Sequence, residues 1–135
     1  MRAMGEREAT ILDGDFTVNG GYNATFKACH GCEGVPFDAL FASNDLAASG
    51  AIKALNDLGI RVPEQISVIG YGDIVPLNQL HQMSTVGQNP SRLGELCVEA
   101  LETASCDLAA LRQRLIIEPE LVLRGTCKEL IGYED

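Results

Sequence analysis

Short apolar runs alternate with longer amphipathic stretches along this chain, and this alternation constrains its fold more than any other feature. Five runs have the composition of buried strands: residues 10–12, 38–42, 66–70, 115–117 and 121–123. Three stretches repeat apolar side chains at helical spacing: residues 18–30, 45–58 and 90–104. Residues 38–71 therefore form a strand, helix, strand unit of βαβ length. The sequence predicts an α/β fold with a mainly parallel sheet covered on both faces.

The ends of the predicted helices carry suitable capping residues. Thr17, Asn44 and Asn89 are placed to cap the three helices, and Pro90 would occupy the first helical position of the third. Gly59 follows the last apolar residue of the second helix, where a left-handed residue commonly ends a helix. These signals support the helix boundaries that the apolar spacing indicates.

Composition excludes several classes of protein. With 46% hydrophobic and 21% charged residues in 135, the chain has the make-up of a globular domain with a core. Nineteen acidic against ten basic residues give a net charge of -9, which leaves no broad footprint for the phosphates of nucleic acid. No apolar run is long enough to span a membrane, and no secretory signal opens the chain.

The chemistry-bearing motifs are few. No nucleophile elbow, phosphate-binding loop or dinucleotide fingerprint occurs, so we expect neither an enzyme nor a cofactor. Five cysteines, an odd and scattered number without an export signal, indicate reduced thiols in a cytoplasm. Cys29 and Cys32 form a C-x-x-C motif, which can be a redox pair, half of a zinc site or merely a helix end. Its position at a helix C-terminus opposes a thiolate, and no second metal-binding pair accompanies it.

Polar residues follow the first three predicted strands. These strands end in Asp13–Phe16, Ser43–Asp45 and Gly70–Asp73. In open α/β sheets, ligands bind outside the carboxyl ends of the strands, so these residues could hold a small polar molecule. The same residue types also make turns and cap helices, and position alone leaves both interpretations open.

Four segments resemble the lactose-repressor (LacI/GalR) family of bacterial transcription regulators. Residues 37–51 (FDALFASNDLAASGA) look like the strand and helix signature of that family, and residues 58–71 are similar to its next loop and strand. Residues 84–90 resemble the segment at which the chain crosses between two lobes, and residues 119–126 its closing strand. The segments are in order and correctly spaced from about Asp13 to Thr126.

The resemblance implies a periplasmic-binding-protein-like (type I) fold, with two Rossmann-like lobes and a small molecule in the cleft between them. It implies that this chain is a C-terminal fragment: residues 1–88 mainly in the C-terminal lobe, 89–118 returning to the N-terminal lobe, and 119–126 the closing strand. In the family, a strand and helix before residue 9 supply a central strand of this lobe. The separate N-terminal DNA-binding domain is expected to be absent.

The family's ligand contacts carry over residue by residue. Phe16 matches an aromatic that packs against the effector, and Asn44 and Asp45 match a pair whose first member contacts it and whose second often caps the helix. Gln88 matches a polar residue at the lobe crossover. Gly72 stands where the family commonly has an aspartate that accepts from a sugar hydroxyl, so this role could pass to Asp73 or the ligand could differ.

We therefore expect the effector-sensing, dimerising part of a cytoplasmic transcription regulator. The resemblance implies a small-molecule effector such as a sugar, DNA contact only through the missing domain, and no membrane contact. It also implies a homodimer or higher self-association, using the helix from Asn44 and the loop of residues 76–84. Ala47, Ala48, Ala51 and Ile52 offer a small, apolar face on that helix. Two alternatives stay open: part of a solute-binding protein of a transporter, and a thiol-redox protein built on Cys29 and Cys32.

Overall fold

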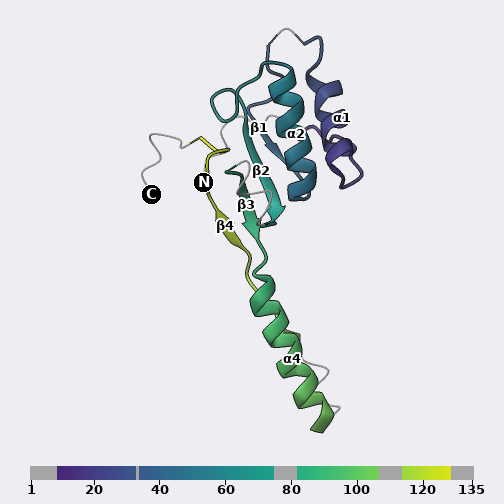
Figure 1. The fold of residues 1–135 in the computed structure, drawn as a ribbon, viewed down its shortest axis with the longest axis vertical. Helices are drawn as coiled ribbons and strands as arrows, with labels where there is room; N and C mark the ends of the chain where they lie inside the picture. Colours follow the sequence, from purple (N-terminus) through teal and green to yellow (C-terminus); the bar gives the residue numbers. More distant parts are fainter. Residues whose placement is uncertain (1–8, 33, 75–81, 107–113, 129–135) are drawn as a thin grey trace.

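The computed structural model describes residues 9–32, 34–74, 82–106 and 114–128. Its elements are α1 (Val18–Cys29), β1 (Ala39–Phe41), α2 (Asp45–Asp57), β2 (Ser67–Gly72), β3 (Ser84–Gly87), α4 (Pro90–Cys106) and β4 (Glu120–Val122). The strands form one sheet in the order β1-β2-β3-β4, in which the first three are parallel and β4 is antiparallel to β3 (Figure 1). The α/β class and the βαβ unit, here β1-α2-β2, are confirmed.

The helices begin where the capping residues predict. The Thr17 hydroxyl accepts a hydrogen bond from the Gly20 amide, and Asn44 Oδ1 accepts one from the Ala47 amide. Asn89 Oδ1 accepts from the Arg92 amide one turn into α4, which starts at Pro90. Each bond satisfies one of the amides that a helix N-terminus leaves without an internal partner.

The core lies between the sheet and the two helices that cover one of its faces. Leu55 and Ala48 of α2 pack with Ile66, Val68 and the fully buried Met83. The helices approach each other closely, because a Cβ at Gly21 would overlap the backbone of Ala47, and one at Gly50 the backbone of Val18. Small residues on α2 therefore serve packing inside the chain.

That packing corrects one expectation about self-association. The α2 face predicted to dimerise is buried in this chain: Ala47, Ala48, Ala51 and Ile52 are at most 8% exposed. Because α1 and the sheet already cover these side chains, they are not available to a second copy. Residues 75–81 of the loop also expected there lie outside the described residues.

Two predicted strands do not form, at residues 10–12 and 115–117. Among the described residues β1 pairs only with β2, and residues 9–12 line the far side of a cavity next to β1. Residues 10–12 pair with no strand among the described residues, and Ile11 is 89% exposed. The expected covering of both sheet faces also fails in the described ranges, where α1 and α2 lie on the same face of the sheet (Figure 1). Leu40 packs against the core, so the next residue, Phe41, points to the opposite face, where it is 63% exposed.

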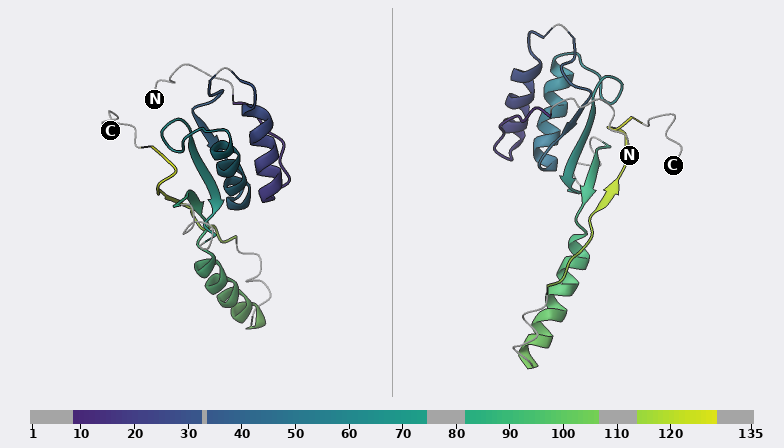
Figure 2. Two further views of the ribbon diagram at one scale, coloured as in Figure 1. Left: turned by 45° about the horizontal axis from the view of Figure 1, so that its top comes forward. Right: turned by 180° about the vertical axis from the view of Figure 1, so that it is seen from behind.

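Helix α4 projects away from the body of the fold, and residues 114–119 run back along it to β4 (Figures 1 and 2). We call α4 and residues 114–119 the arm. The apolar face that predicted this helix is largely uncovered, with Leu93 at 51% and Leu101 at 67% exposure. Within the described ranges, no helix has the length and apolar character to cross a membrane.

Candidate functional site

The carboxyl ends of β1, β2 and β3 meet at the edge of the sheet that faces the arm (Figure 1). Five residues follow these ends or lie next to them, and we call them the rim: Phe16, Asn44, Tyr71, Asp73 and Gln88. Parallel pairing brings residues from distant parts of the chain to one edge, which is where ligands of open α/β sheets bind.

Asn44 connects two segments of the rim. Its Oδ1 caps α2, while its Nδ2 donates a hydrogen bond to the Phe16 carbonyl at 2.9 Å. An amide has two donor hydrogens and two acceptor lone pairs, so one of each remains for a ligand. Phe16 is 61% exposed and has a φ of 61°, a left-handed conformation unusual for a bulky residue. Asn44 thus holds an exposed aromatic ring at the rim in a strained backbone.

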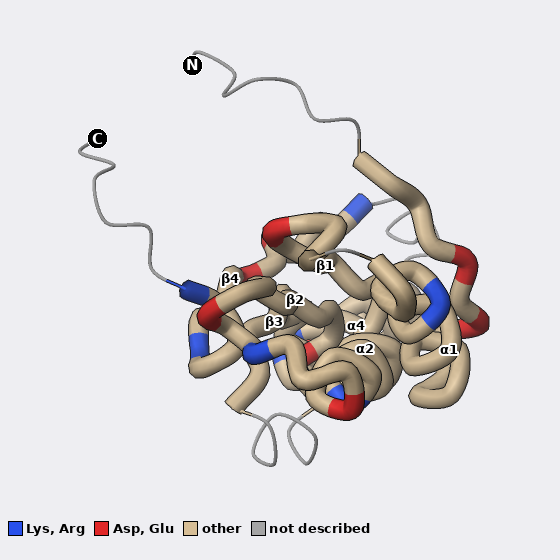
Figure 3. Tube along the Cα trace, turned by 90° about the horizontal axis from the view of Figure 1, so that it is seen from above, with Lys and Arg blue, Asp and Glu red and all other residues tan. Residues whose placement is uncertain are grey.

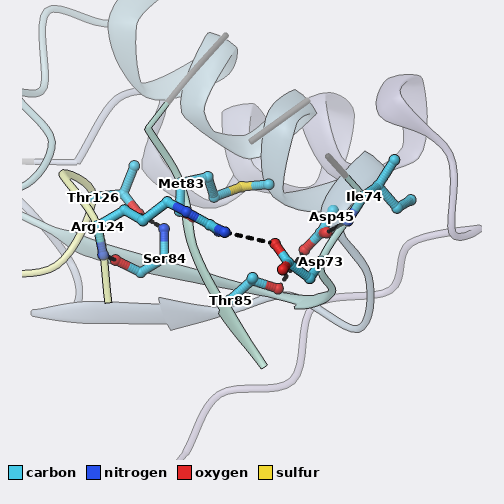
Figure 4. Close-up of polar contacts among 8 residues, drawn as sticks. All are labelled: Asp45, Asp73, Ile74, Met83, Ser84, Thr85, Arg124 and Thr126. Carbon is cyan, nitrogen blue, oxygen red and sulfur yellow. Dashed lines mark hydrogen bonds and ion pairs between the residues drawn. The ribbon is translucent and has the colours of Figure 1, made fainter. Parts of the chain in front are cut away.

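Asp45, the next residue, lies beneath the rim and is fully buried. Its Oδ1 accepts from the Thr85 hydroxyl at 2.7 Å, and its Oδ2 accepts from the Ile74 amide at 2.6 Å (Figure 4). A Cβ at Gly70 would overlap Asp45 Oδ1, so β2 must carry glycine where the carboxylate crosses it. Asp45 therefore joins the start of α2 to β3 and to the segment after β2.

Asp73 pairs with Arg124, from the segment that follows β4. Arg124 Nη2 donates to Asp73 Oδ1 at 2.8 Å, its Nη1 donates to the Met83 carbonyl, and its backbone amide donates to the Ser84 hydroxyl (Figure 4). The two paired side chains are only 25% and 27% exposed. This pair fixes the end of β2 against the start of β3 and the closing segment.

Gln88 and Tyr71 connect the rim to the arm. Gln88 Nε2 donates to Tyr71 Oη at 3.3 Å. Both residues line a pocket of about 360 Å³, with Leu93, Leu96, Cys97, Ala100, Leu115, Ile117 and Pro119 of the arm. The pocket combines a polar end at the rim with an apolar wall on the arm, which is the usual make-up of a small-molecule site.

Gly72 separates Tyr71 from Asp73 and has a φ of 121°. L-residues rarely adopt this conformation, so the backbone itself favours glycine at this position. Gly72, which replaces the aspartate that the resemblance implies, therefore stands where the backbone of this chain favours glycine.

Comparison with known proteins identifies the fold. Residues 4–127 match the family described as periplasmic binding protein-like domain. The chain belongs to this family. It is 36% identical to the HTH-type transcriptional repressor PurR of Haemophilus influenzae (strain PittEE) over 96% of the chain and 41% of that protein. The chain therefore spans about two fifths of the length of the curated relatives it matches.

Solved structures of the periplasmic binding protein-like domain agree. The lac repressor dimer bound to operator and the anti-inducer ONPF superposes with a TM-score of 0.74 at 29% identity, covering 84% of this chain and 39% of that one. A LacI family transcriptional regulator from Arthrobacter sp. FB24, in complex with lactose, gives 0.73 at 27% identity, covering 87% and 44%. The resemblance to the LacI family is confirmed, and these relatives are regulators rather than enzymes.

Sequence reasoning missed two side chains that organise this periplasmic binding protein-like site. Arg124 and Thr85 are partners of Asp73 and Asp45, yet no local pattern marks either of them. The available signals were weak: an arginine in the segment that resembles the family's closing strand, and a threonine between Ser84 and Val86, in a stretch that is not one of the predicted apolar runs. Their roles depend on contacts across 40 or 51 positions, which spacing along the chain does not reveal.

The cysteine motif lies away from the rim, at the other end of α1. Cys29 is buried in the core, and this burial raises the pKa of its thiol, with a further increase from the neighbouring Cys32. Cys32 Sγ donates to the Ala28 carbonyl. A raised pKa disfavours the thiolate that redox chemistry needs. No cluster of three metal-binding side chains occurs in the described part of the chain.

Proposed function

We propose that this chain is the effector-sensing part of a LacI-family transcription regulator and that it binds a small polar molecule at the rim. The observation that carries the proposal is the convergence of Phe16, Asn44, Asp73 and Gln88 at the carboxyl ends of three parallel strands. An exposed ring beside amide and carboxylate groups suits a molecule with one apolar face and several hydroxyls. The lactose complex of one relative supports a sugar as the first class to test.

In this proposal the five site residues predicted from the sequence have different roles: Phe16, Asn44, Asp45, Asp73 and Gln88. Phe16, Asn44 and Gln88 contact the effector, since they are exposed or retain hydrogen-bonding capacity. Asp73 contacts it with an oxygen next to the Arg124 pair. Asp45 supports the site from below by holding the Ile74 amide and Thr85 in place.

The arm completes the proposed cleft. We assign residues 1–88 mainly to one lobe, 89–118 to a second lobe, and 119–126 to a closing strand that returns to the first. The exposed apolar residues Leu93 and Leu101 support this assignment, because a helix face of this kind needs a covering surface. Effector binding between the lobes would change the affinity of a DNA-binding domain for its operator. Because operator DNA lies in the bacterial cytoplasm, we propose the cytoplasm as the location.

An NMR titration tests the proposal. The ¹⁵N-labelled chain is titrated with lactose, cellobiose, ribose, nucleosides and small carboxylic acids. Because the described residues supply one wall of a cleft, we expect binding no tighter than about 1 mM, with shifts confined to the rim. Asn44→Ala should abolish them, and Asn56→Ala, a change of the same residue type at the other end of α2, should not. Shifts absent from the rim for every compound would contradict the proposal.

A further inference from the structure

The C-x-x-C motif at the end of α1 takes no part in the proposed effector site, but its four residues form a defined turn. The Cys32 amide donates a hydrogen bond to the Cys29 carbonyl at 3.4 Å. His30 has φ and ψ angles of -68° and 125°, and Gly31 has a φ of 80°. These angles are those of a type II β-turn, whose third residue needs a left-handed backbone and is commonly glycine. The two cysteines are therefore the first and last residues of this turn.

This turn brings the two thiols within reach of a disulfide. The first and fourth Cα atoms of a β-turn lie less than about 7 Å apart, and disulfides join Cα atoms about 4.4–6.8 Å apart. Cys32 Sγ donates to the Ala28 carbonyl at 3.3 Å, which holds this side chain against the last turn of α1, where Cys29 lies. The charge interaction with Cys32 that adds to the raised pKa of Cys29 also places the two sulfurs close together.

Local contacts fix the turn. The His30 ring stacks on the Phe26 ring with centroids 5.0 Å apart, and the His30 amide donates to the Phe26 carbonyl at 2.8 Å. A Cβ at Gly31 would have no atom within 4 Å, so glycine is favoured there by its backbone conformation and not by lack of space. The reach between the cysteines thus depends on the backbone of the two residues between them.

The two thiols differ in their access to a reagent. Cys32 is exposed, whereas Cys29 is only 5% exposed and belongs to the core. A thiolate must reach a disulfide to attack it, so Cys32 is the better attacking group. Cys29 is suited to the second step, because attack on a group already attached to Cys32 is intramolecular and benefits from a high effective concentration.

We propose that Cys29 and Cys32 form a reversible modification site for small-molecule disulfides such as oxidised glutathione. The Cys32 thiolate attacks one sulfur of the small disulfide, which forms a mixed disulfide and releases one small thiolate that takes up the proton lost by Cys32. Cys29 then attacks the Cys32 sulfur, and its proton goes to the second leaving thiolate. Two protein thiols are oxidised, and one small disulfide is reduced to two thiols. Excess thiol reverses both steps, so the pair responds to the surrounding thiol–disulfide balance.

Peptide mapping by mass spectrometry tests the roles of the two thiols. The reduced 135-residue chain is incubated with oxidised glutathione at pH 8, quenched with acid at timed intervals and digested. We expect a Cys29–Cys32 disulfide, whereas Cys97, an exposed thiol outside any C-x-x-C motif, should carry glutathione. Cys29→Ala should trap glutathione on Cys32. In Cys32→Ala, glutathione should reach Cys29 at least about tenfold more slowly than Cys97.

Two results of this mapping would overturn the proposal. One is a wild-type chain in which glutathione stays on Cys32 and no Cys29–Cys32 disulfide follows. The other is a Cys32→Ala variant in which Cys29 takes up glutathione as fast as Cys97, because Cys29 would then be the attacking thiol.

A pair of glycine variants tests the geometry of the turn. Without the disulfide, Gly31→Ala can leave the left-handed conformation, so closing the disulfide must restore it. We expect the equilibrium constant for disulfide closure against glutathione to fall about tenfold. Gly59→Ala, at the end of α2, has a φ of 72° and the same open surroundings, and should change this constant less than about twofold. Circular dichroism checks that both variants fold. Equal effects of the two substitutions would show that the turn does not set the reach of the thiols and would overturn the proposal.

Discussion

The guanidinium of Arg124 lies 2.8 Å from the carboxylate of Asp73, although 51 positions separate the two residues. The pair joins the segment after β4, which returns from the arm, to the rim at the end of β2. The Arg124 side chain also donates to the Met83 carbonyl at the start of β3. The Arg124 side chain therefore contacts both the rim, at Asp73, and the start of β3, and it holds the segment after β4 against them.

Replacing Arg124 should destabilise the chain measurably. Arg124→Ala removes the guanidinium that donates to Asp73 and to the Met83 carbonyl in a half-buried site, and we expect a loss of about 2 kcal/mol in the free energy of unfolding. Lys53→Ala breaks the exposed pair between Lys53 and Asp57 and should cost less than about 0.5 kcal/mol. Urea unfolding followed by circular dichroism compares the two. Equal losses would show that the Arg124 pair has no special structural role.

Two glycines offer a matched pair of opposite predictions. Gly70→Ala places a methyl group against the buried Asp45 carboxylate, and we expect a loss of about 1–3 kcal/mol. Gly94→Ala lies inside α4, where nothing approaches within 4 Å, and should stabilise the helix by about 0.5–1 kcal/mol. Thermal unfolding of both variants gives the sign directly. A neutral Gly70→Ala would mean that Asp45 does not occupy its place across β2.

Local patterns predicted the elements whose partners are close in sequence. The caps Thr17, Asn44 and Asn89 bond to amides three residues further on, so residue type and spacing were sufficient to place them. The strands of the βαβ unit were predicted by their apolar runs, and each finds its partner at the other end of one connecting helix. Residues 10–12 have strand composition, but a strand also needs a neighbouring backbone, and composition does not report whether one is present. The strand predicted at residues 10–12 does not form, and β1 pairs on one side only, because the described residues place no strand between them.

The position of the candidate site was predictable from the sequence, but the hydrogen bonds and ion pairs between its residues were not. The ends of the predicted strands correctly placed Asn44 and Asp73 at one edge of the sheet. Nothing local distinguished Asn44, which keeps hydrogen-bonding capacity at the surface, from Asp45, which is fully buried beside it. This difference arises from the cap geometry of α2 and from Thr85, a residue 40 positions away.

The thiols should differ in reactivity. Only the thiolate form of a cysteine is alkylated. Because burial raises the pKa of Cys29, a smaller fraction of its thiol is ionised at a given pH, and its alkylation rate rises only at higher pH. We expect iodoacetamide at pH 8 to label the exposed Cys32 and Cys97 before Cys29. Mass spectrometry of timed samples measures the order, with the urea-unfolded chain as the control in which the differences vanish. Early labelling of Cys29 would favour the thiol-redox alternative.

DNA binding provides the last prediction. The net charge of -9 repels a phosphate backbone, and in the backbone trace of Figure 3 the positions of acidic and basic residues are interspersed along the described residues rather than gathered in a basic stretch. The operator-bound relative matches over 39% of its length only. We therefore expect these 135 residues not to bind DNA specifically, whatever effector is present.

Fluorescence anisotropy with a labelled duplex containing the lac operator, and a scrambled duplex of equal composition, measures this. At 50 mM salt we expect no saturable binding tighter than about 100 μM to either duplex, because non-specific binders that reach this range use several Lys or Arg contacts to phosphates. Raising the salt to 200 mM should change little, since few counterions would be released. A preference for the operator duplex that weakens steeply with salt would mean that a DNA-binding surface exists within this chain.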